Sequence, residues 1–127
     1  MTRNIASVSP SDSLQKCAKK MVQERINSIV VTEGKRLLGI LTARDILWAM
    51  TKKPTLNLKK VTSMDIAKRK IAVIKPSADI SDALEKMRAS NFRRLPVLSK
   101  GEIIGVVTLK DILAIEPTLY GEVRGLI

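Results

Sequence analysis

The feature that most constrains this chain is an internal repeat with a fixed spacing of 66 residues. The stretch 39–47 returns at 105–113, and both copies read glycine, two aliphatic residues, threonine, two further residues, aspartate, isoleucine and leucine. The same shift pairs Pro10 with Pro76. A constant shift over most of each half indicates a duplicated structural unit, and a single spacing gives two copies rather than a solenoid.

Each copy predicts the element order β-α-β-β-α. Apolar residues recur at helical spacing after the first strand, and two aliphatic runs flank a glycine-containing turn, which indicates a hairpin. In the first copy we expect strands at 3–8, 28–31 and 37–41, a helix from Ser9 or Ser11 to about Arg25, and a helix over 43–50. In the second copy we expect a lead-in helix at 61–66, strands at 70–74, 94–98 and 103–107, and helices over 76–90 and 109–115.

The length and the repeat together set the fold class. A chain of 127 residues can bury a core of its own. Aromatic residues are only 2%, so this core must consist of aliphatic side chains and methionine. We predict an α/β fold of the α+β type, in which two tandem β-α-β-β-α motifs, residues 1–57 and 58–127, pack as a pseudo-twofold pair.

The formal net charge of +11 is concentrated where the two copies join. Residues 51–75 contain eight lysines and arginines against Asp65 alone. Such a segment is typical of a surface that attracts polyanions, and it is equally typical of a well-solvated linker. The sequence leaves both interpretations open.

Several classes of protein are disfavoured by what the sequence lacks. No apolar run approaches the roughly 18 residues of a membrane span, and no apolar signal segment precedes the repeat. We therefore expect a cytoplasmic protein that makes no membrane contact. Cys17 is the only cysteine and there is no histidine, which excludes an internal disulfide and argues against a zinc site. No nucleophile or general-base constellation stands out, so we do not expect an enzyme.

The repeated Thr-x-x-Asp motif, Thr42 to Asp45 and Thr108 to Asp111, has two interpretations. A threonine that follows a strand can cap a helix, with the aspartate accepting a hydrogen bond from the threonine backbone. Alternatively the motif binds a ligand, because an ionised carboxylate can accept two hydroxyl donors at once. The duplication, the strand before each motif and the basic residue inside each favour binding, and the two roles are compatible.

With these motifs the chain resembles a tandem pair of CBS domains, a family named after cystathionine β-synthase, over essentially its full length. The resemblance rests on the two Gly-h-h-Thr-x-x-Asp motifs, where h is aliphatic, on the hairpin before each, and on residues 93–97. It implies that an adenosine nucleotide (AMP, ADP or ATP) or S-adenosylmethionine binds in the cleft between the two motifs. It also implies a regulatory role toward a partner protein, with no separate cofactor.

The resemblance assigns roles to residues in both copies. Ribose hydroxyls would be bound by Asp45 and Asp111, and ribose or phosphate by Thr42 and Thr108. Phosphate would be contacted by Arg44 and Lys110, and by Arg93 and Arg94. The counterparts of Arg93 and Arg94 in the first copy are the neutral Asn27 and Ser28. Adenine would lie on Ile5, Ala6 and Ser7 and on Ile71, Ala72 and Val73, with Ile40 and Val106 beneath it. An arginine pair before a strand is also a common solvated edge, so the role of 93–94 stays open.

Leu47, Trp48 and Met50 are either ordinary core residues or a contact surface on the helix 43–50. The resemblance favours a homodimer formed through this helix and its counterpart at 109–115. The main alternative to a nucleotide sensor is a nucleic-acid-binding protein that uses the basic linker. Against that alternative, the chain has one residue each of Phe, Trp and Tyr, and stacking aromatics are the usual means of binding single strands.

Overall fold

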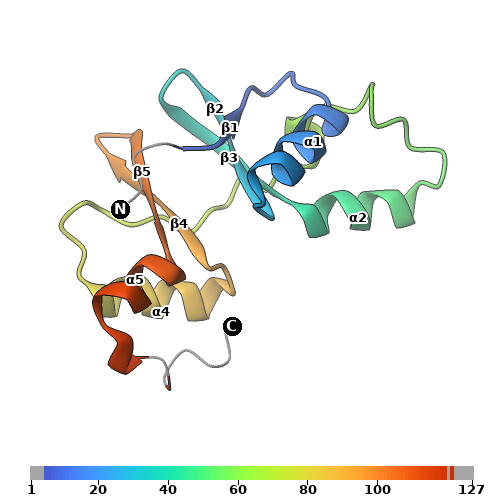
Figure 1. Ribbon diagram of the computed structural model, residues 1–127. Coiled ribbons are helices and arrows are strands. Elements are labelled where there is room, and N and C mark those ends of the chain that lie inside the picture. Colours follow the sequence, from blue (N-terminus) through green and yellow to red (C-terminus); the bar gives the residue numbers. More distant parts are fainter. Residues whose placement is uncertain (1–4, 120, 122–127) are drawn as a thin grey trace. The chain divides into compact units, whose positions relative to one another are not determined.

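The computed structural model describes residues 5–119 and 121, and it divides into two compact units (Figure 1). The first unit is Ala6–Ile71, and the second comprises Ile5 and the described residues from Ala72 onward. Each unit combines a β-hairpin with helices, which confirms the predicted α/β class. Among the described residues, no helix has both the length and the apolar character needed to cross a membrane.

The first unit contains a three-stranded sheet in the order β1, β2, β3. Its elements are β1 (Ser7–Val8), α1 (Leu14–Glu24), β2 (Ser28–Glu33), β3 (Arg36–Thr42), α2 (Ala43–Lys52) and α3 (Ser63–Ile66). Strand β1 runs parallel to β2, and β2 and β3 form the antiparallel hairpin. The hairpin, its following helix and the lead-in helix are therefore confirmed, and β1 is shorter than predicted within the described residues.

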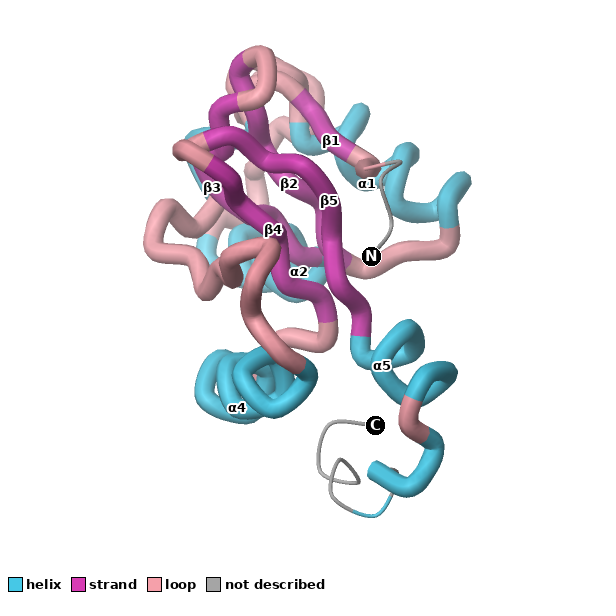
Figure 2. The backbone as a smooth tube through the Cα atoms, turned by 90° about the vertical axis from the view of Figure 1, so that its left-hand side faces the viewer, coloured by secondary structure: helices cyan, strands magenta, loops and turns pink. Residues whose placement is uncertain are grey.

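The second unit repeats the hairpin and its flanking helices. Its elements are α4 (Ile80–Ser90), β4 (Arg94–Ser99), β5 (Glu102–Thr108) and α5 (Leu109–Ile115). Strands β4 and β5 pair antiparallel, and β5 leads directly into α5 (Figure 2). The strand predicted at 70–74 is wrong for the described chain, because this segment contributes only a single bridge from Ile74 to Val97.

The repeat extends to individual contacts. The bridge from Ile74 to Val97 is the counterpart, 66 residues on, of the pair formed by β1 and β2 at Val8 and Val31. The hairpins share an irregularity in register at equivalent positions, after Val31 and after Val97. One duplicated backbone therefore underlies both units.

Both long helices begin later than the sequence predicts. Helix α1 begins at Leu14, because the side chain of Ser13, rather than Ser9 or Ser11, accepts a hydrogen bond from the backbone N–H of Lys16 at 3.1 Å. The equivalent helix α4 begins at Ile80 after its cap Asp79, and not at residue 76. Serine, threonine and aspartate all cap helices well, so a stretch with several of them does not fix the start by itself.

The helices α1 and α4 end in the same way. Arg25 follows α1 with φ 55° and ψ 44°, and Asn91 follows α4 with φ 58° and ψ 28°. Both residues are left-handed, a conformation that closes a helix by turning the chain away from its axis.

Each unit has an aliphatic core, as the composition predicts. The first core contains Val8, Leu14, Cys17, Met21, Ile29, Val31, Leu41 and Ile46, and the second contains Ile74, Ala83, Leu84, Met87, Leu95, Val97, Leu109 and Ile112. Val61, Met64, Ile66 and Ala67 also pack on the first core. The segment 61–67, which the sequence places in the second motif, thus packs in the first unit, and the boundary at 57/58 stays a prediction about the motifs.

Candidate functional site

The first Thr-x-x-Asp motif lies at the junction where β3 passes into α2. Thr42 is the N-cap, and its hydroxyl accepts a hydrogen bond from the backbone N–H of Asp45 at 3.0 Å. In return, the Oδ2 atom of Asp45 accepts from the backbone N–H of Thr42 at 2.9 Å. This reciprocal pair is a capping box, which satisfies two N–H groups that the helix leaves unpaired.

Lys68 completes this junction and is a residue that the sequence analysis missed. Its Nζ atom lies 3.4 Å from Oδ1 of Asp45, whose side chain is only 12% exposed. The backbone of Lys68 is fixed by two hydrogen bonds to Ile40, at 2.9 and 2.8 Å. The only sequence feature that pointed to Lys68 was its place in the basic linker, since nothing in the repeat connects position 68 to position 45.

The glycine of the motif has a steric role at the same place. A side chain at Gly39 would meet the backbone oxygen of Lys68 at 3.0 Å, the Met64 side chain at 3.2 Å and that of Ala67 at 3.3 Å. The absence of a Cβ atom therefore lets the linker approach β3 closely enough to bring Lys68 to Asp45.

The second motif forms the same junction between β5 and α5. The hydroxyl of Thr108 accepts from the backbone N–H of Asp111 at 3.0 Å, and Oδ2 of Asp111 accepts from the N–H of Thr108 at a longer 3.3 Å. The expected helix caps are thus present in both copies. Capping leaves acceptor capacity on each carboxylate, because its two oxygens offer about four acceptor positions.

The residue just before the first strand of each hairpin holds the start of the capped helix. The carbonyl of Asn27 accepts from the backbone N–H of Ala43 at 2.9 Å, and the carbonyl of Arg93 accepts from that of Leu109 at 2.8 Å. The side chains differ, as the sequence indicates. Those of Asn27 and Arg93 are exposed, Arg94 is half-buried and Ser28 is buried.

The other predicted ligand residues lie close to these junctions along the chain. Arg44 and Lys110 are exposed in the first turn of α2 and α5. The residues expected to contact adenine are all half-buried, namely Ile5, Ala6, Ser7, Ile71, Ala72 and Val73. Ile40 and Val106 are buried, and each faces a strand partner, Val30 and Pro96 respectively. Ile40 lies on the face of β3 opposite Leu41, which belongs to the core.

A third Thr-x-x-Asp sequence shows what the cap looks like without the preceding hairpin. Oδ2 of Asp65 accepts from the backbone N–H of Thr62 at 2.9 Å at the start of α3. This hydrogen bond lowers the pKa of the Asp65 carboxyl, because it favours the ionised form. No strand leads into Thr62 and Asp65 is exposed, so the pair serves as a cap alone. Among residues 5–119, no group of three or more His, Cys, Asp or Glu side chains could hold a metal ion.

Comparison with known protein families identifies the family of the chain. A family model for the CBS domain matches residues 1–52 and 63–117, which cover both motifs. The chain belongs to the CBS domain family. The resemblance drawn from the sequence is thereby confirmed.

Relatives of similar architecture occur in archaea and bacteria. The CBS domain-containing protein YhcV of Bacillus subtilis is 30% identical over 112 residues, which cover 88% of this chain and 79% of YhcV. The uncharacterized protein MK0525 of Methanopyrus kandleri is 29% identical over 124 residues, or 96% of this chain. The match spans 63% of MK0525, so that protein extends beyond the part that this chain matches.

A solved structure matches the chain almost from end to end. The CBS domain protein PAE2072 from Pyrobaculum aerophilum, complexed with AMP, has a TM-score of 0.80 and 27% sequence identity. The match covers 98% of this chain and 95% of that one.

Proposed function

We propose that the chain is a regulatory CBS module that binds an adenosine nucleotide through its two Thr-x-x-Asp junctions and signals its presence to a partner protein. The observation that carries the proposal is the duplication of one junction, in which a hairpin strand delivers a capped aspartate with a basic residue beside it. The AMP complex of PAE2072 supports the class of ligand. A binding role is proposed rather than catalysis.

The residues of each junction suit the parts of a nucleotide. The carboxylates of Asp45 and Asp111 would accept hydrogen bonds from ribose hydroxyls while they continue to cap their helices. Arg44 and Lys110, exposed in the first helical turn, would attract the phosphates. Lys68 would hold the Asp45 carboxylate in place from the other side, at 3.4 Å.

The competing interpretation is that both aspartates are caps and nothing more. Asp65 provides a matched control, because it makes the same hydrogen bond to its threonine without a hairpin in front. Asparagine at each position keeps a side-chain oxygen for the cap and removes the charge. The three variants therefore separate capping from ligand binding.

Isothermal titration calorimetry with AMP, ADP, ATP and S-adenosylmethionine tests the proposal. We expect at least one of these to bind. Because a hydrogen bond to a charged group contributes about 1.5–3 kcal/mol, Asp45→Asn and Asp111→Asn should weaken binding by about 10- to 150-fold. Asp65→Asn should leave the affinity unchanged. If none of the four compounds binds, or if all three variants bind as the wild type does, the motifs are helix caps only.

We also propose that the module forms a homodimer through α2 and α5. Leu47 and Trp48 are each 62% exposed on α2, and Met50 is 44% exposed. Ile115 at the end of α5 is 67% exposed. Large exposed apolar side chains on a helix are typical of a protein interface, and tryptophan is a frequent anchor there.

A further inference from the structure

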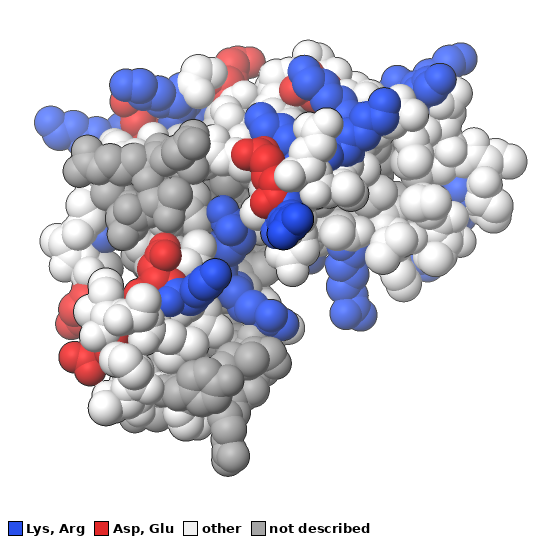
Figure 3. Space-filling model, in the orientation of Figure 1, with Lys and Arg blue, Asp and Glu red and all other residues white. Residues whose placement is uncertain are grey.

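Positive charge is concentrated in the first unit. Residues 6–71 contain 14 lysines and arginines and 5 aspartates and glutamates, so this unit carries +9 of the total +11. Basic side chains are spread over the part of the surface that α1 and the linker form, with fewer acidic ones among them (Figure 3). A charge of this size on about half of the chain should attract anionic partners to this unit.

The outward face of α1 is a basic groove. Lys16, Lys19 and Lys20 recur at the spacing of one helical face, while the opposite face of the helix is buried in the core. Together with Ser13, Gln15, Gln23 and Glu24 they line a groove of about 490 Å³. Three amines and two amides in this lining are donors suited to phosphate oxygens, against the single acidic side chain of Glu24.

Residues 58–61 of the linker lie beside the start of α1. The backbone N–H of Gln15 donates to the carbonyl of Leu58 at 3.0 Å, and that of Leu14 donates to the carbonyl of Val61 at 2.9 Å. These bonds place the exposed Lys59 and Lys60 beside the first turn of α1. We call the set Lys16, Lys19, Lys20, Lys59 and Lys60 the basic face.

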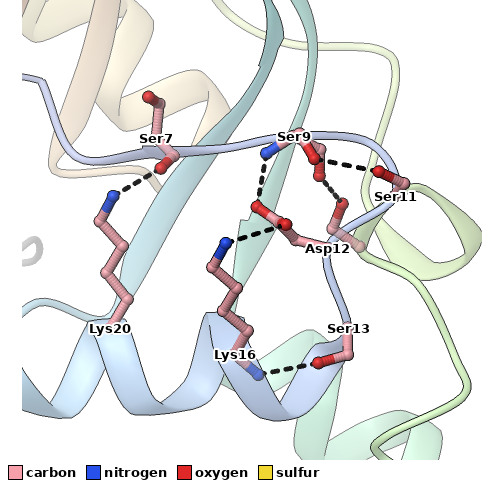
Figure 4. A network of polar contacts seen from close by, with 8 residues as sticks. Ser7, Ser9, Ser11, Asp12, Ser13, Lys16 and Lys20 are labelled. Atoms are coloured by element: carbon pink, nitrogen blue, oxygen red, sulfur yellow. Dashed lines mark hydrogen bonds and ion pairs between the residues drawn. The ribbon is translucent and has the colours of Figure 1, made fainter.

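Two lysines of the basic face are anchored and three are available. Lys16 bonds to Oδ1 of Asp12 at 3.1 Å, and Lys20 donates to the carbonyl of Ser7 at 2.7 Å (Figure 4). For the other three, Lys19, Lys59 and Lys60, no acidic partner lies within ion-pair distance in the described part of the chain. Their ammonium groups are free to contact an anion.

The duplicated helix shows that the fold does not require this charge. Helix α4 has Asp82 where α1 has Lys16, and Glu85 where α1 has Lys19. A groove along the corresponding face of α4 is lined by these two acidic side chains and by Lys75 and Lys86, so its charges balance. The same scaffold thus carries a net positive charge in only one of its two copies, which makes the basic face a specific property of the first unit.

We propose that the basic face binds the phosphate backbone of double-stranded nucleic acid, independently of the nucleotide proposed for the Thr-x-x-Asp junctions. The groove lining contains no aromatic side chain on which unpaired bases could stack. A duplex carries about one negative charge per 1.7 Å, a higher density than a single strand. Insertion of α1 into a membrane surface is disfavoured, because its apolar face already packs in the core.

Fluorescence anisotropy with a labelled 20-base-pair DNA duplex over 50–200 mM salt tests the proposal on the full chain. If each of the three available lysines neutralises one phosphate, the slope of log K against log salt should be about −2.7, and affinity should fall about 40-fold over this range. The triple variant Lys19→Gln/Lys59→Gln/Lys60→Gln should remove most of this salt dependence. Glutamine keeps the helix propensity of position 19, and circular dichroism checks the fold.

The control variant is Lys35→Gln/Arg36→Gln/Lys75→Gln, which removes the same charge from exposed positions outside the basic face. Positions 35 and 36 lie at the β2–β3 turn, at the other end of the first unit from the linker (Figure 1). The control should keep the wild-type slope. Equal losses in the two triple variants, or no duplex binding at 50 mM salt, would overturn the proposal. Tighter binding to a single strand or to anionic phospholipid vesicles than to the duplex would also overturn it. Calorimetry with adenine nucleotides should show the same affinity in the triple variant and the wild type.

Discussion

Replacing Gly39 with alanine tests whether the close approach of the linker to β3 holds the first junction together. The new Cβ atom would lie 3.0 Å from the backbone oxygen of Lys68 and 3.2 Å from the terminal methyl of Met64. The methionine methyl can rotate away. The backbone oxygen is fixed, because it accepts a hydrogen bond from the N–H of Ile40 at 2.9 Å. The strain must therefore be relieved by displacing the linker.

Two effects of opposite sign decide the magnitude. Overpacking a well-packed site costs about 1–3 kcal/mol of stability. Alanine in place of glycine recovers about 0.5–1 kcal/mol, because the unfolded chain loses conformational freedom. We expect Gly39→Ala to lower the free energy of unfolding by about 1–2 kcal/mol, and the melting temperature by about 4–8 °C for a chain of this length.

Urea and thermal unfolding followed by far-ultraviolet circular dichroism measure this change. Gly121→Ala is the control, since no atom of the described residues lies within 4 Å of a Cβ at that position, and its melting temperature should match the wild type. Gly39→Val should lower the free energy of unfolding more than Gly39→Ala does, because valine adds volume at the same contact. A Gly39→Ala protein as stable as the wild type would refute the reasoning, and so would a valine variant no worse than alanine.

Three further outcomes are expected. The N–H of Ser9 donates to the Asp12 carboxylate and holds its pKa below the usual value. Asp12 should therefore stabilise the folded protein above about pH 4, and this stabilisation should be lost as the pH falls through the lowered pKa. Between pH 7 and pH 3, the urea midpoint should fall less steeply in Asp12→Asn than in the wild type. Burial raises the pKa of the Cys17 thiol to about 11, so a disulfide reagent such as DTNB should label the folded protein at pH 8 far more slowly than the protein in urea; equal rates would contradict this burial. Trp48→Ala should shift the mass measured by light scattering from dimer toward monomer, whereas a wild type that is monomeric at micromolar concentration would rule out the proposed dimer.

Most of the fold could be predicted because its signals are local. The hairpins follow from short aliphatic runs around a turn, and α5 begins and ends where the sequence indicates, at Leu109 and Ile115. The start of α1 could not be predicted, since the choice among several serines depends on where the chain leaves β1. The segment 70–74 reads as a strand, yet only Ile74 pairs, because pairing depends on a partner that the local sequence does not contain.

In the candidate site, too, the local contacts could be predicted and the contacts between distant residues could not. The capping of Asp45 and Asp111 is local and follows from the spacing of three residues to the threonine. The contact of Lys68 with Asp45 joins residues far apart in sequence, and the fixed shift offers no guide to it, because that shift pairs Lys68 with Thr2 and Asp45 with Asp111. The third motif at Thr62 was overlooked because no aliphatic strand precedes it.

The left-handed residues that end α1 and α4 show how one copy of the repeat can guide stabilising substitutions in the other. The two copies keep φ within a few degrees at Arg25 and Asn91, although the side chains have diverged. Asparagine adopts this conformation more readily than arginine does. The two copies therefore share the backbone conformation at this position more closely than they share the residue type. Transplanting the better residue from one half into the other gives an internal consensus, from which more heat-resistant versions can be designed using this sequence alone.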